Sequence, residues 1–314
     1  MRKNLFRSIT ALAGVALLTA ACGESASSSD ASGEGNGDGT TLTLAAVPSE
    51  ESTSLQSQFE VLIKHLEEET GTTIEVQQAT DYAAVVEGQR AGKIDIAAYG
   101  PFSYIIAADG GIPLQPLAAV IDEEGEEPGY FSGAYVLADS EIQDLEEARD
   151  KRVCFVDRAS TSGYLYPSAG LLDIDIDPAE DVTEVLAGGH DASLLALKNG
   201  ECDIAYAFED MEGQLVEGGE LEEGEVRQIW KSERIMGSPI AVNTDSVDAE
   251  IVEKLQEAFT TANVETFVEK GLCDSVEDCP LPEGAEWGFA VVEDGDYAGV
   301  REVCDITQAE ACNV

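Results

Sequence analysis

Three consecutive hydroxyl residues, Ser160, Thr161 and Ser162, form the densest cluster of chemically useful side chains in the sequence. They follow an apolar segment and precede Gly163, where a helix running toward Leu172 is expected. The first N–H groups of a helix have no partner within it and lie at the positive end of its dipole. Hydroxyl donors at such a position favour binding of a small oxyanion without a lysine. The same residue types also suit simple helix capping, so the motif alone leaves both interpretations open.

The segment Gly188–Ser193 repeats this arrangement, because two glycines open an expected helix and place His190 in its first turn. A histidine there is able to donate a hydrogen bond to an anion. A lone histidine is more often structural, but its place at a strand-to-helix turn favours a binding role. His65 lies within an expected helix and is interpreted as a surface residue.

Tyrosines and acids add further candidates for the same site. Tyr82, Tyr104 and Tyr130 offer phenol donors, although packing is the commoner role of a tyrosine. Glu209 and Asp210 follow an expected strand, where a carboxylate would accept a proton from a ligand amine or from a protonated oxyanion. In so acidic a chain, a solvated surface is the competing interpretation of either acid.

A serine hydrolase would use the same residue types, with Ser160 or Ser162 as nucleophile and His190 as base. The G-x-S-x-G pattern of a nucleophile elbow is absent around these serines. Ser162 and His190 are also both expected at helix starts, where they serve as donors rather than as a base and nucleophile. We therefore expect no catalytic residue, and neither a cofactor nor a metal site.

Alternating strands and helices must position these residues. Thr41–Val47 reads as a strand, and Ser52 is expected to cap a helix that ends at Gly71. The alternation continues to about Val264, which predicts α/β layers with mostly parallel sheets.

An internal echo predicts two related lobes. Ala91–Gly100 and Asn199–Phe208 both follow an expected helix, contain a capping glycine and continue as a strand with the sequence Asp-Ile-Ala. Ligands bind outside the carboxyl ends of such strands, so Tyr99–Tyr104 and Phe208–Met211 are expected to face each other across a cleft. We expect residues 41–132 plus 243–314 to form lobe one and residues 133–242 to form lobe two. The two crossings, Gly129–Val136 and Ser238–Asn243, would act as hinges.

The composition excludes one broad class of partner. The chain has 314 residues, of which 63 are acidic and 17 basic, for a formal charge of −46. A surface this acidic repels polyphosphate backbones, so we expect no nucleic-acid binding. The hydrophobic share of 44% is sufficient for a packed core.

The N-terminus is interpreted as an export signal. A basic start precedes the apolar stretch Ile9–Leu18, which is too short to span a membrane. Leu18–Gly23 resembles the lipobox of bacterial lipoproteins, with Thr19 where Leu is commoner. The resemblance implies a signal peptide at 1–21, lipidation of Cys22 and a protein held at the outer face of the cytoplasmic membrane. Residues 22–40 are rich in Gly, Ser and acid and are expected to form a flexible tether.

Six further cysteines are expected to be oxidised outside the cytoplasm. Fifteen pairings of six cysteines are possible. We predict Cys154–Cys202, Cys273–Cys279 and Cys304–Cys312, the last two closing short loops. A metal cluster is the alternative, but no histidine lies near these cysteines in the sequence.

Several segments recur in the order typical of one family. These are Thr80–Tyr82, Gly100–Tyr104, Ser160–Gly163 before Pro167, Gly188–Ser193, and Ser238 with Pro239. Together they resemble the phosphate-, phosphonate- and phosphite-binding components of ABC importers, over about residues 41–264.

The resemblance implies a two-lobed periplasmic-binding-protein fold (type II-like) that closes on a small phosphorus oxyanion, acts as a monomer and delivers its ligand to membrane permease subunits. By position, Ser160, Thr161 and Ser162 would hold the oxygens, with His190 and Tyr82 donating as well. Tyr104 or Tyr130 would complete the site, and Glu209 would meet the ligand's substituent. A receptor of the same fold for another organic anion, such as a sulfonate or a pyrimidine, is the alternative. The tail after about Cys273 matches no part of the family pattern.

Overall fold

The computed structural model describes residues 40–48, 55–121, 125–276, 279 and 287–313. These residues belong to one compact unit. The expected signal peptide, the lipidated Cys22, the tether up to residue 39 and the cap at Ser52 lie outside the described residues.

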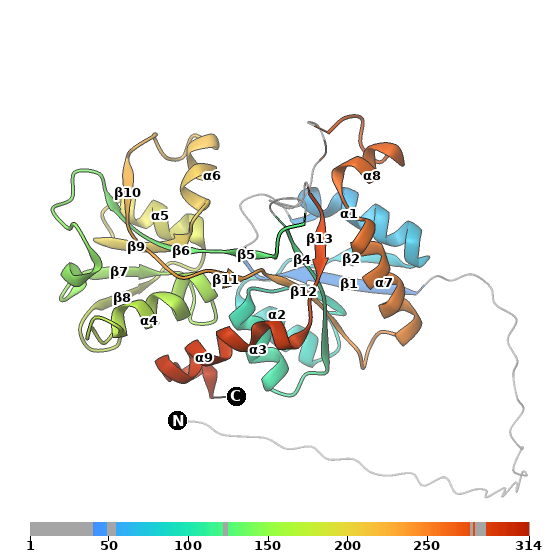
Figure 1. Cartoon of the computed structure of the whole chain (residues 1–314), viewed down its shortest axis with the longest axis horizontal. Coiled ribbons are helices and arrows are strands. Elements are labelled where there is room, and N and C mark those ends of the chain that lie inside the picture. The colour runs from blue at the N-terminus through green and yellow to red at the C-terminus, as the bar shows by residue number, and fades with distance from the viewer. Residues whose placement is uncertain (1–39, 49–54, 122–124, 277–278, 280–286, 314) are drawn as a thin grey trace, which may run out of the picture. The chain divides into compact units, whose positions relative to one another are not determined.

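Lobe one is built on a six-stranded sheet of order β13-β4-β12-β3-β1-β2 (Figure 1). Its strands are β1 (Thr41–Ala46), β2 (Thr73–Val76), β3 (Ile96–Ala98), β4 (Leu114–Val120), β12 (Pro239–Asn243) and β13 (Phe289–Val291). Its helices are α1 (Leu55–Thr70), α2 (Tyr82–Arg90), α3 (Pro101–Asp109), α7 (Ala249–Thr261), α8 (Val264–Glu269) and α9 (Ala298–Thr307), with short turns η4 (Asp294–Tyr297) and η5 (Glu310–Cys312).

Both faces of this sheet are covered, as the alternation along β1 indicates. Leu42 and Leu44 pack in one core with residues of α1 and α7, whereas Ala45 packs in a second core with α2, α3 and α9. Successive side chains of a strand point to opposite faces, so a strand that is buried on both faces needs apolar residues at nearly every position. The second half of β1, Leu44–Ala46, is apolar and buried throughout and meets that requirement, whereas Thr41 and Thr43 in the first half are not fully buried.

Lobe two is built on a five-stranded sheet of order β10-β6-β9-β7-β8. Its strands are β6 (Ser132–Leu137), β7 (Arg152–Phe155), β8 (Thr183–Leu186), β9 (Ile204–Phe208) and β10 (Val226–Lys231). Its helices are α4 (Tyr166–Leu172), α5 (His190–Lys198) and α6 (Met211–Glu217), with short turns η2 (Leu145–Ala148) and η3 (Thr161–Leu165). Here too one core lies on each face, one with Leu171 of α4 and the other with Leu194 of α5.

Two chain crossings join the lobes, and they pair with each other. β5 (Gly129–Tyr130) and β11 (Ile235–Met236) form a short antiparallel ribbon. β12 then pairs with β3 and β4 in the sheet of lobe one. The chain therefore returns to that sheet at Pro239, four residues before the expected boundary at 243. The division into two lobes with that boundary stays a proposal.

The two-lobed α/β fold agrees with the expectation, but the sheets are less parallel than expected. Parallel pairing is confined to β1, β2 and β3 in lobe one and to β7, β8 and β9 in lobe two. The strands next to the crossings, β4, β6, β10 and β12, pair antiparallel with their neighbours. Strands that carry the chain from one lobe to the other do not follow the helix-connected βαβ pattern that forces parallel order.

The three predicted disulfides, Cys154–Cys202, Cys273–Cys279 and Cys304–Cys312, are present. The surface interpretation of His65 is wrong. Its side chain is fully buried between α1 and α7, where a ring nitrogen lies 3.0 Å from the carbonyl oxygen of Ala258. Within the described part of the chain, no helix combines the length and the apolar character needed to cross a membrane.

Candidate functional site

The three hydroxyl residues lie at the start of a single helical turn that follows β7. Ser160 caps the turn, because its Oγ accepts a hydrogen bond from the N–H of Gly163 at 3.0 Å. The turn has π-helical bonding, which is often found at functional sites. Ser160, Thr161 and Ser162 are all nearly fully buried, at 1 to 2% exposure. The capping interpretation of Ser160 is therefore confirmed, and its binding role stays a prediction. We call residues Ser160–Gly163 the serine loop.

Close packing explains the glycine that ends this loop. A Cβ atom at Gly163 would lie 2.3 Å from the side chain of Val156 and 2.8 Å from Oγ of Ser160. Real side chains do not approach this closely, so only glycine lets the loop fold back onto the end of β7.

The start of β6 is hydrogen-bonded to the serine loop. Ser132 Oγ donates to the carbonyl oxygen of Ser162 at 2.6 Å, and the N–H of Ser132 donates to Ser232 Oγ at 2.9 Å. Ser132 is fully buried. Sequence analysis did not identify these two serines, although Ser132 lies within the expected crossing segment.

His190 lies beside the serine loop in a defined protonation state. The N–H of Phe208 donates to Nδ1 of His190 at 3.1 Å, so Nδ1 carries no proton. Complete burial lowers the pKa of His190 to about 3, so the ring is neutral. Its single proton is then on Nε2, which lies 3.4 Å from Ser160 Oγ. His190 therefore presents a donor, not a base, to the serine loop.

Backbone bonds hold the two donor segments together. The N–H groups of Ala187 and Gly188 donate to the carbonyl oxygens of Phe155 and Val156, each at 2.8 Å. These bonds continue the parallel pairing of β7 with β8 beyond the strand ends. The sequence places a donor segment after each strand, and the sheet makes them neighbours.

Lobe one touches the site through the start of α3. The N–H of Phe102 donates to Thr161 Oγ1 at 2.8 Å in a buried contact. Ser160 and Thr161 thus each accept a bond through the hydroxyl oxygen, which leaves the hydroxyl proton to donate. Two hydroxyl protons and the Nε2 proton of His190 form a compact set of neutral donors, which suits a small oxyanion.

The predicted tyrosines all belong to, or pack against, one core cluster of lobe one. Tyr82 is buried at the start of α2, in a core that also contains Val156 and Leu165 of lobe two. Tyr130, in β5, is half-buried and packs against that core. Tyr104 is buried in the same core, and its hydroxyl donates to Asp294 of the tail at 3.0 Å.

The predicted acid also has another partner. The carboxylate of Glu209 pairs with Lys231 at 2.7 Å, and within the described residues no hydrogen bond or ion pair joins this carboxylate to the serine loop. Asp157 lies three residues before the serine loop, and its Oδ1 accepts from the N–H of Ala159 at 2.8 Å. Burial raises the pKa of Asp157, and the negative charge of Asp81 in lobe one raises it further.

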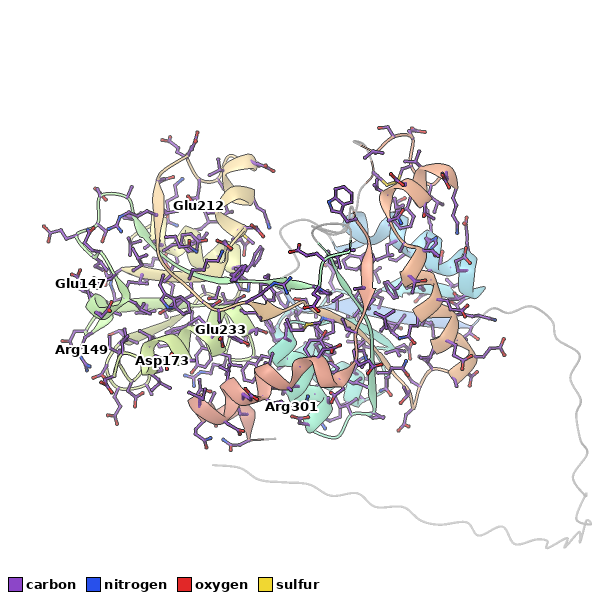
Figure 2. The ribbon with its side chains drawn as sticks, viewed as in Figure 1. Glu147, Arg149, Asp173, Glu212, Glu233 and Arg301 are labelled. Atoms are coloured by element: carbon purple, nitrogen blue, oxygen red, sulfur yellow. A yellow bond between two sulfur atoms is a disulfide. The ribbon has the colours of Figure 1, made fainter. Side chains whose placement is uncertain are left out.

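Outside the serine loop, some charged side chains lie at the ends of the lobes. Glu147 and Arg149 lie at the outer end of lobe two (Figure 2). No group of three or more His, Cys, Asp or Glu side chains within the described residues is arranged to hold a metal ion.

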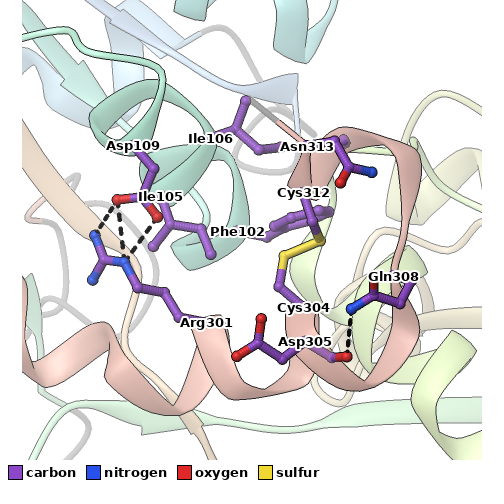
Figure 3. Close-up of a pocket in the computed structure, with 11 residues that line it drawn as sticks. Phe102, Ile105, Ile106, Asp109, Arg301, Cys304, Asp305, Gln308, Cys312 and Asn313 are labelled. Carbon is purple, nitrogen blue, oxygen red and sulfur yellow. Dashed lines mark hydrogen bonds and ion pairs between the residues drawn. A yellow bond between two sulfur atoms is a disulfide. The ribbon is translucent and has the colours of Figure 1, made fainter.

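The tail forms a separate cavity of about 360 Å³ between α3, α9 and η5 (Figure 3). Arg301 of α9 is bonded there to Asp109 at the end of α3, at 2.7 Å. The disulfide Cys304–Cys312 borders the cavity. None of the predicted ligand residues lines it.

Comparison with known proteins identifies relatives over most of the chain. A family model described as "ABC transporter, phosphonate, periplasmic substrate-binding protein" matches residues 44–277. The phosphate-import protein PhnD of Mycolicibacterium smegmatis is 43% identical over 313 residues, which cover 96% of each chain. The phosphonates-binding periplasmic protein of Escherichia coli is 31% identical over 206 residues, which cover 63% of this chain and 60% of that protein.

Solved structures show the same fold. The binding protein component of an ABC phosphonate transporter from Pseudomonas aeruginosa superposes with a TM-score of 0.72 at 26% identity, over 86% of this chain and 87% of that one. PhnD1 of Prochlorococcus marinus, in complex with methylphosphonate, superposes with a TM-score of 0.71 at 16% identity, over 86% of this chain and 99% of that one. The second likeness concerns the fold alone. On the match over residues 44–277 and the 43% identity over most of the chain, this protein belongs to the phosphonate family of periplasmic substrate-binding proteins of ABC transporters.

Proposed function

We propose that this protein, as the substrate-binding component of an ABC importer for phosphonate or phosphate, binds its ligand as a small phosphorus oxyanion at the serine loop. Ser160, Thr161 and Ser162 hold the oxygens, and His190 and Tyr82 donate from the two sides. The observation that supports this most strongly is the state of the donors. His190 is neutral with its proton on Nε2, and the oxygens of Ser160 and Thr161 already accept N–H bonds.

Phosphate is the first ligand to test. The relative from Mycolicibacterium smegmatis, 43% identical, is named for phosphate import, whereas the 31% identical relative from Escherichia coli is named for phosphonates. Neutral donors suit either ion. The carboxylate of Glu209 is paired with Lys231, and its contact with the ligand's substituent stays a prediction. The contributions of Tyr104 and Tyr130 to the site also stay predictions.

We propose that the protein binds without catalysing a reaction. A serine hydrolase needs the unprotonated Nε2 of its histidine to face the nucleophile, with an acid holding Nδ1–H. Here Nδ1 accepts from the N–H of Phe208, so Nε2 carries the proton and faces Ser160 as a donor. This arrangement is unsuited to removing a proton from a serine.

The anchoring, oligomeric state and transfer steps are also proposals. Lipidation of Cys22 would hold the protein at the outer face of the cytoplasmic membrane, with residues 22–40 as a tether. As a monomer it would bind its anion between the lobes and deliver it to permease subunits. Donors on both lobes stabilise the closed arrangement only when an anion bridges them, which makes binding a population shift.

Calorimetric titration of the purified protein tests the proposal. The panel is phosphate, phosphite, methylphosphonate, 2-aminoethylphosphonate and, as a tetrahedral control, sulfate. We expect a phosphorus anion to bind and the affinity to fall in Ser160→Ala. Binding of sulfate alone, or of no member of the panel, would instead favour a receptor of the same fold for another organic anion.

A further inference from the structure

Helix α3 begins without a capping side chain of its own. Its N-cap residue is Gly100, Pro101 follows as the first helical residue, and the N–H of Phe102 is the next donor. Such a donor is normally satisfied by the side chain of the N-cap residue. Here the acceptor is Thr161 Oγ1 of lobe two, at 2.8 Å. Phe102 is fully buried and Thr161 is 2% exposed, so water does not readily replace this bond.

The backbone of Gly100 does not itself require glycine. Its φ of −74° and ψ of 153° are ordinary for any residue that precedes a proline. A Cβ atom at this position, however, would lie 3.2 Å from Thr161 Oγ1, tighter than most real contacts. The next atom, Ser103 Oγ, is at an ordinary 3.8 Å. Glycine at position 100 is therefore matched to the approach of Thr161 and not to a local backbone need.

We propose that Thr161 acts as the N-cap of α3 across the contact between the lobes, and that this bond couples anion binding to lobe closure. The inference rests on the proposed function, because it assigns Thr161 two bonds at once. Its oxygen accepts from the N–H of Phe102, which turns its proton toward the bound oxyanion. The positive end of the α3 dipole then acts on the anion through the hydroxyl, without direct contact. Gly100 is a positioning residue that leaves room for this bond.

A double-mutant cycle separates this coupling from simple packing. Gly100→Ala is made in the natural chain and in Thr161→Ala, and phosphate affinity is measured by calorimetry. Thr161→Ala alone is expected to weaken binding about 10- to 100-fold, the cost of a hydrogen bond to a charged group. Gly100→Ala in the natural chain is expected to weaken binding about 5-fold, the size of a mild overpacking effect. In Thr161→Ala the same change is expected to have no effect, since the crowded oxygen is gone.

Two further variants serve as controls. Ser103→Ala alters the same helix start, because Ser103 Oγ donates to the carbonyl oxygen of Gly100 at 2.9 Å, but it does not touch Thr161. We expect unchanged phosphate affinity. Thr161→Ser keeps the hydroxyl and is expected to retain most of the binding. The thermal unfolding midpoint of each variant is measured in parallel, to exclude loss of folding as the cause.

A readout without ligand distinguishes failure of this inference from failure of the proposed function. Amide hydrogen exchange at Phe102 is expected to be faster in Thr161→Ala than in the natural chain, and to be slowed further by phosphate in the natural chain only. If no member of the anion panel binds but Phe102 protection still depends on Thr161, the proposed function fails and the cross-lobe cap stands. Equal losses from Gly100→Ala in both backgrounds, or Phe102 exchange that is indifferent to Thr161, would overturn the cap.

Discussion

The unit α2–β3 of lobe one and the unit α5–β9 of lobe two share one arrangement of helix, glycine and strand, which we call the frame. In each, a helix leads through a left-handed glycine into the Asp-Ile-Ala strand, with φ of 63° at Gly92 and 72° at Gly200. Asp95 Oδ2 accepts from the N–H of Thr43 in β1 at 2.8 Å, and Asp203 Oδ2 accepts from the N–H of Arg152 in β7 at 2.9 Å. The repeated sequence therefore corresponds to a repeated hydrogen bond from a strand N–H to the aspartate.

The two units differ at their helix starts, where Tyr82 and His190 occupy corresponding positions. Asp81 caps α2 with its side chain, whereas Gly189 gives α5 no side-chain cap. The N-terminal N–H groups of α5 are thus left without a cap beside the serine loop. The difference supports the proposal that lobe two presents the main donors and that lobe one closes on them.

The largest expected effect concerns the Cys154–Cys202 disulfide, which has no counterpart in the α2–β3 unit of lobe one. Cys154 and Cys202 correspond in the frame to Ala45 and Ile94, which are buried in lobe one. The double change Cys154→Ala and Cys202→Ile copies lobe one and opens a loop that spans 48 residues. Loop entropy predicts a loss of about 4 kcal/mol of unfolding free energy, measured by urea denaturation.

The tail disulfide provides the control for that change. Cys304→Ala with Cys312→Ala opens a loop of only 8 residues and is expected to cost about 2.5 kcal/mol. A greater loss from the tail pair than from the lobe-two pair would contradict the ranking.

The second comparison removes the two corresponding donors, His190 and Tyr82, one at a time. His190→Phe removes the Nε2–H donor and leaves the N–H of Phe208 without its acceptor, so phosphate affinity is expected to fall about 100-fold. Tyr82→Phe removes a single hydroxyl, and a loss of about 10-fold or less is expected. Calorimetric titration with phosphate measures the loss of affinity in each variant. A larger loss in Tyr82→Phe would reverse the roles assigned to the two lobes.

Sequence patterns predicted the frame because local chemistry determines it. The serines, the Gly-Gly-His segment and the capping glycines each dictate their own helix start or end. The burial of His65 was not predictable in this way, since it depends on the approach of α7, which lies far along the chain. The role of Ser132 and the Phe102–Thr161 bond likewise depend on contacts between segments far apart in the chain, so no local pattern indicated them. Glu209 was placed correctly after its strand, but its ion pair with Lys231 comes from β10.

The third comparison concerns one buried histidine in each lobe. Burial lowers the pKa of His190 to about 3, so this ring is neutral in the folded protein, and burial also lowers the pKa of His65. Below about pH 6.5 the unfolded chain binds more protons at these sites than the folded chain does. The stability that each group contributes is therefore full above about pH 6.5 and declines below it, for His190 down to its folded pKa of about 3.

Urea denaturation at pH 7 and pH 5 measures this decline. The His190 contribution is on the order of 2 kcal/mol over that range. We expect His190→Phe to flatten the pH dependence more than His65→Phe does. An equal or smaller effect of His190→Phe would mean that the ring is not held neutral at the serine loop.

The smallest expected effect concerns the two anchoring aspartates. Asp95→Ala and Asp203→Ala each leave a strand N–H without its acceptor, and each is expected to cost about 1 kcal/mol. Only Asp203 also pairs with a guanidinium, that of Arg152 at 2.7 Å, and this contact lowers its pKa. A lowered carboxyl pKa gives stability that is present above the unfolded value of about 3.9 and is lost as the pH falls below it. The pair is exposed to solvent, so this ionic part is small, below about 1 kcal/mol.

Asparagine variants separate the shared bond from the added one, because the amide oxygen still accepts an N–H but carries no charge. If the frame depends on the backbone bond, Asp95→Asn and Asp203→Asn both recover most of the stability that alanine loses, as measured by urea denaturation at pH 7. A full loss in Asp203→Asn alone would assign that anchor to the ion pair. The two lobes would then hold the same strand geometry by different interactions, and the echoed aspartate would no longer indicate a common frame.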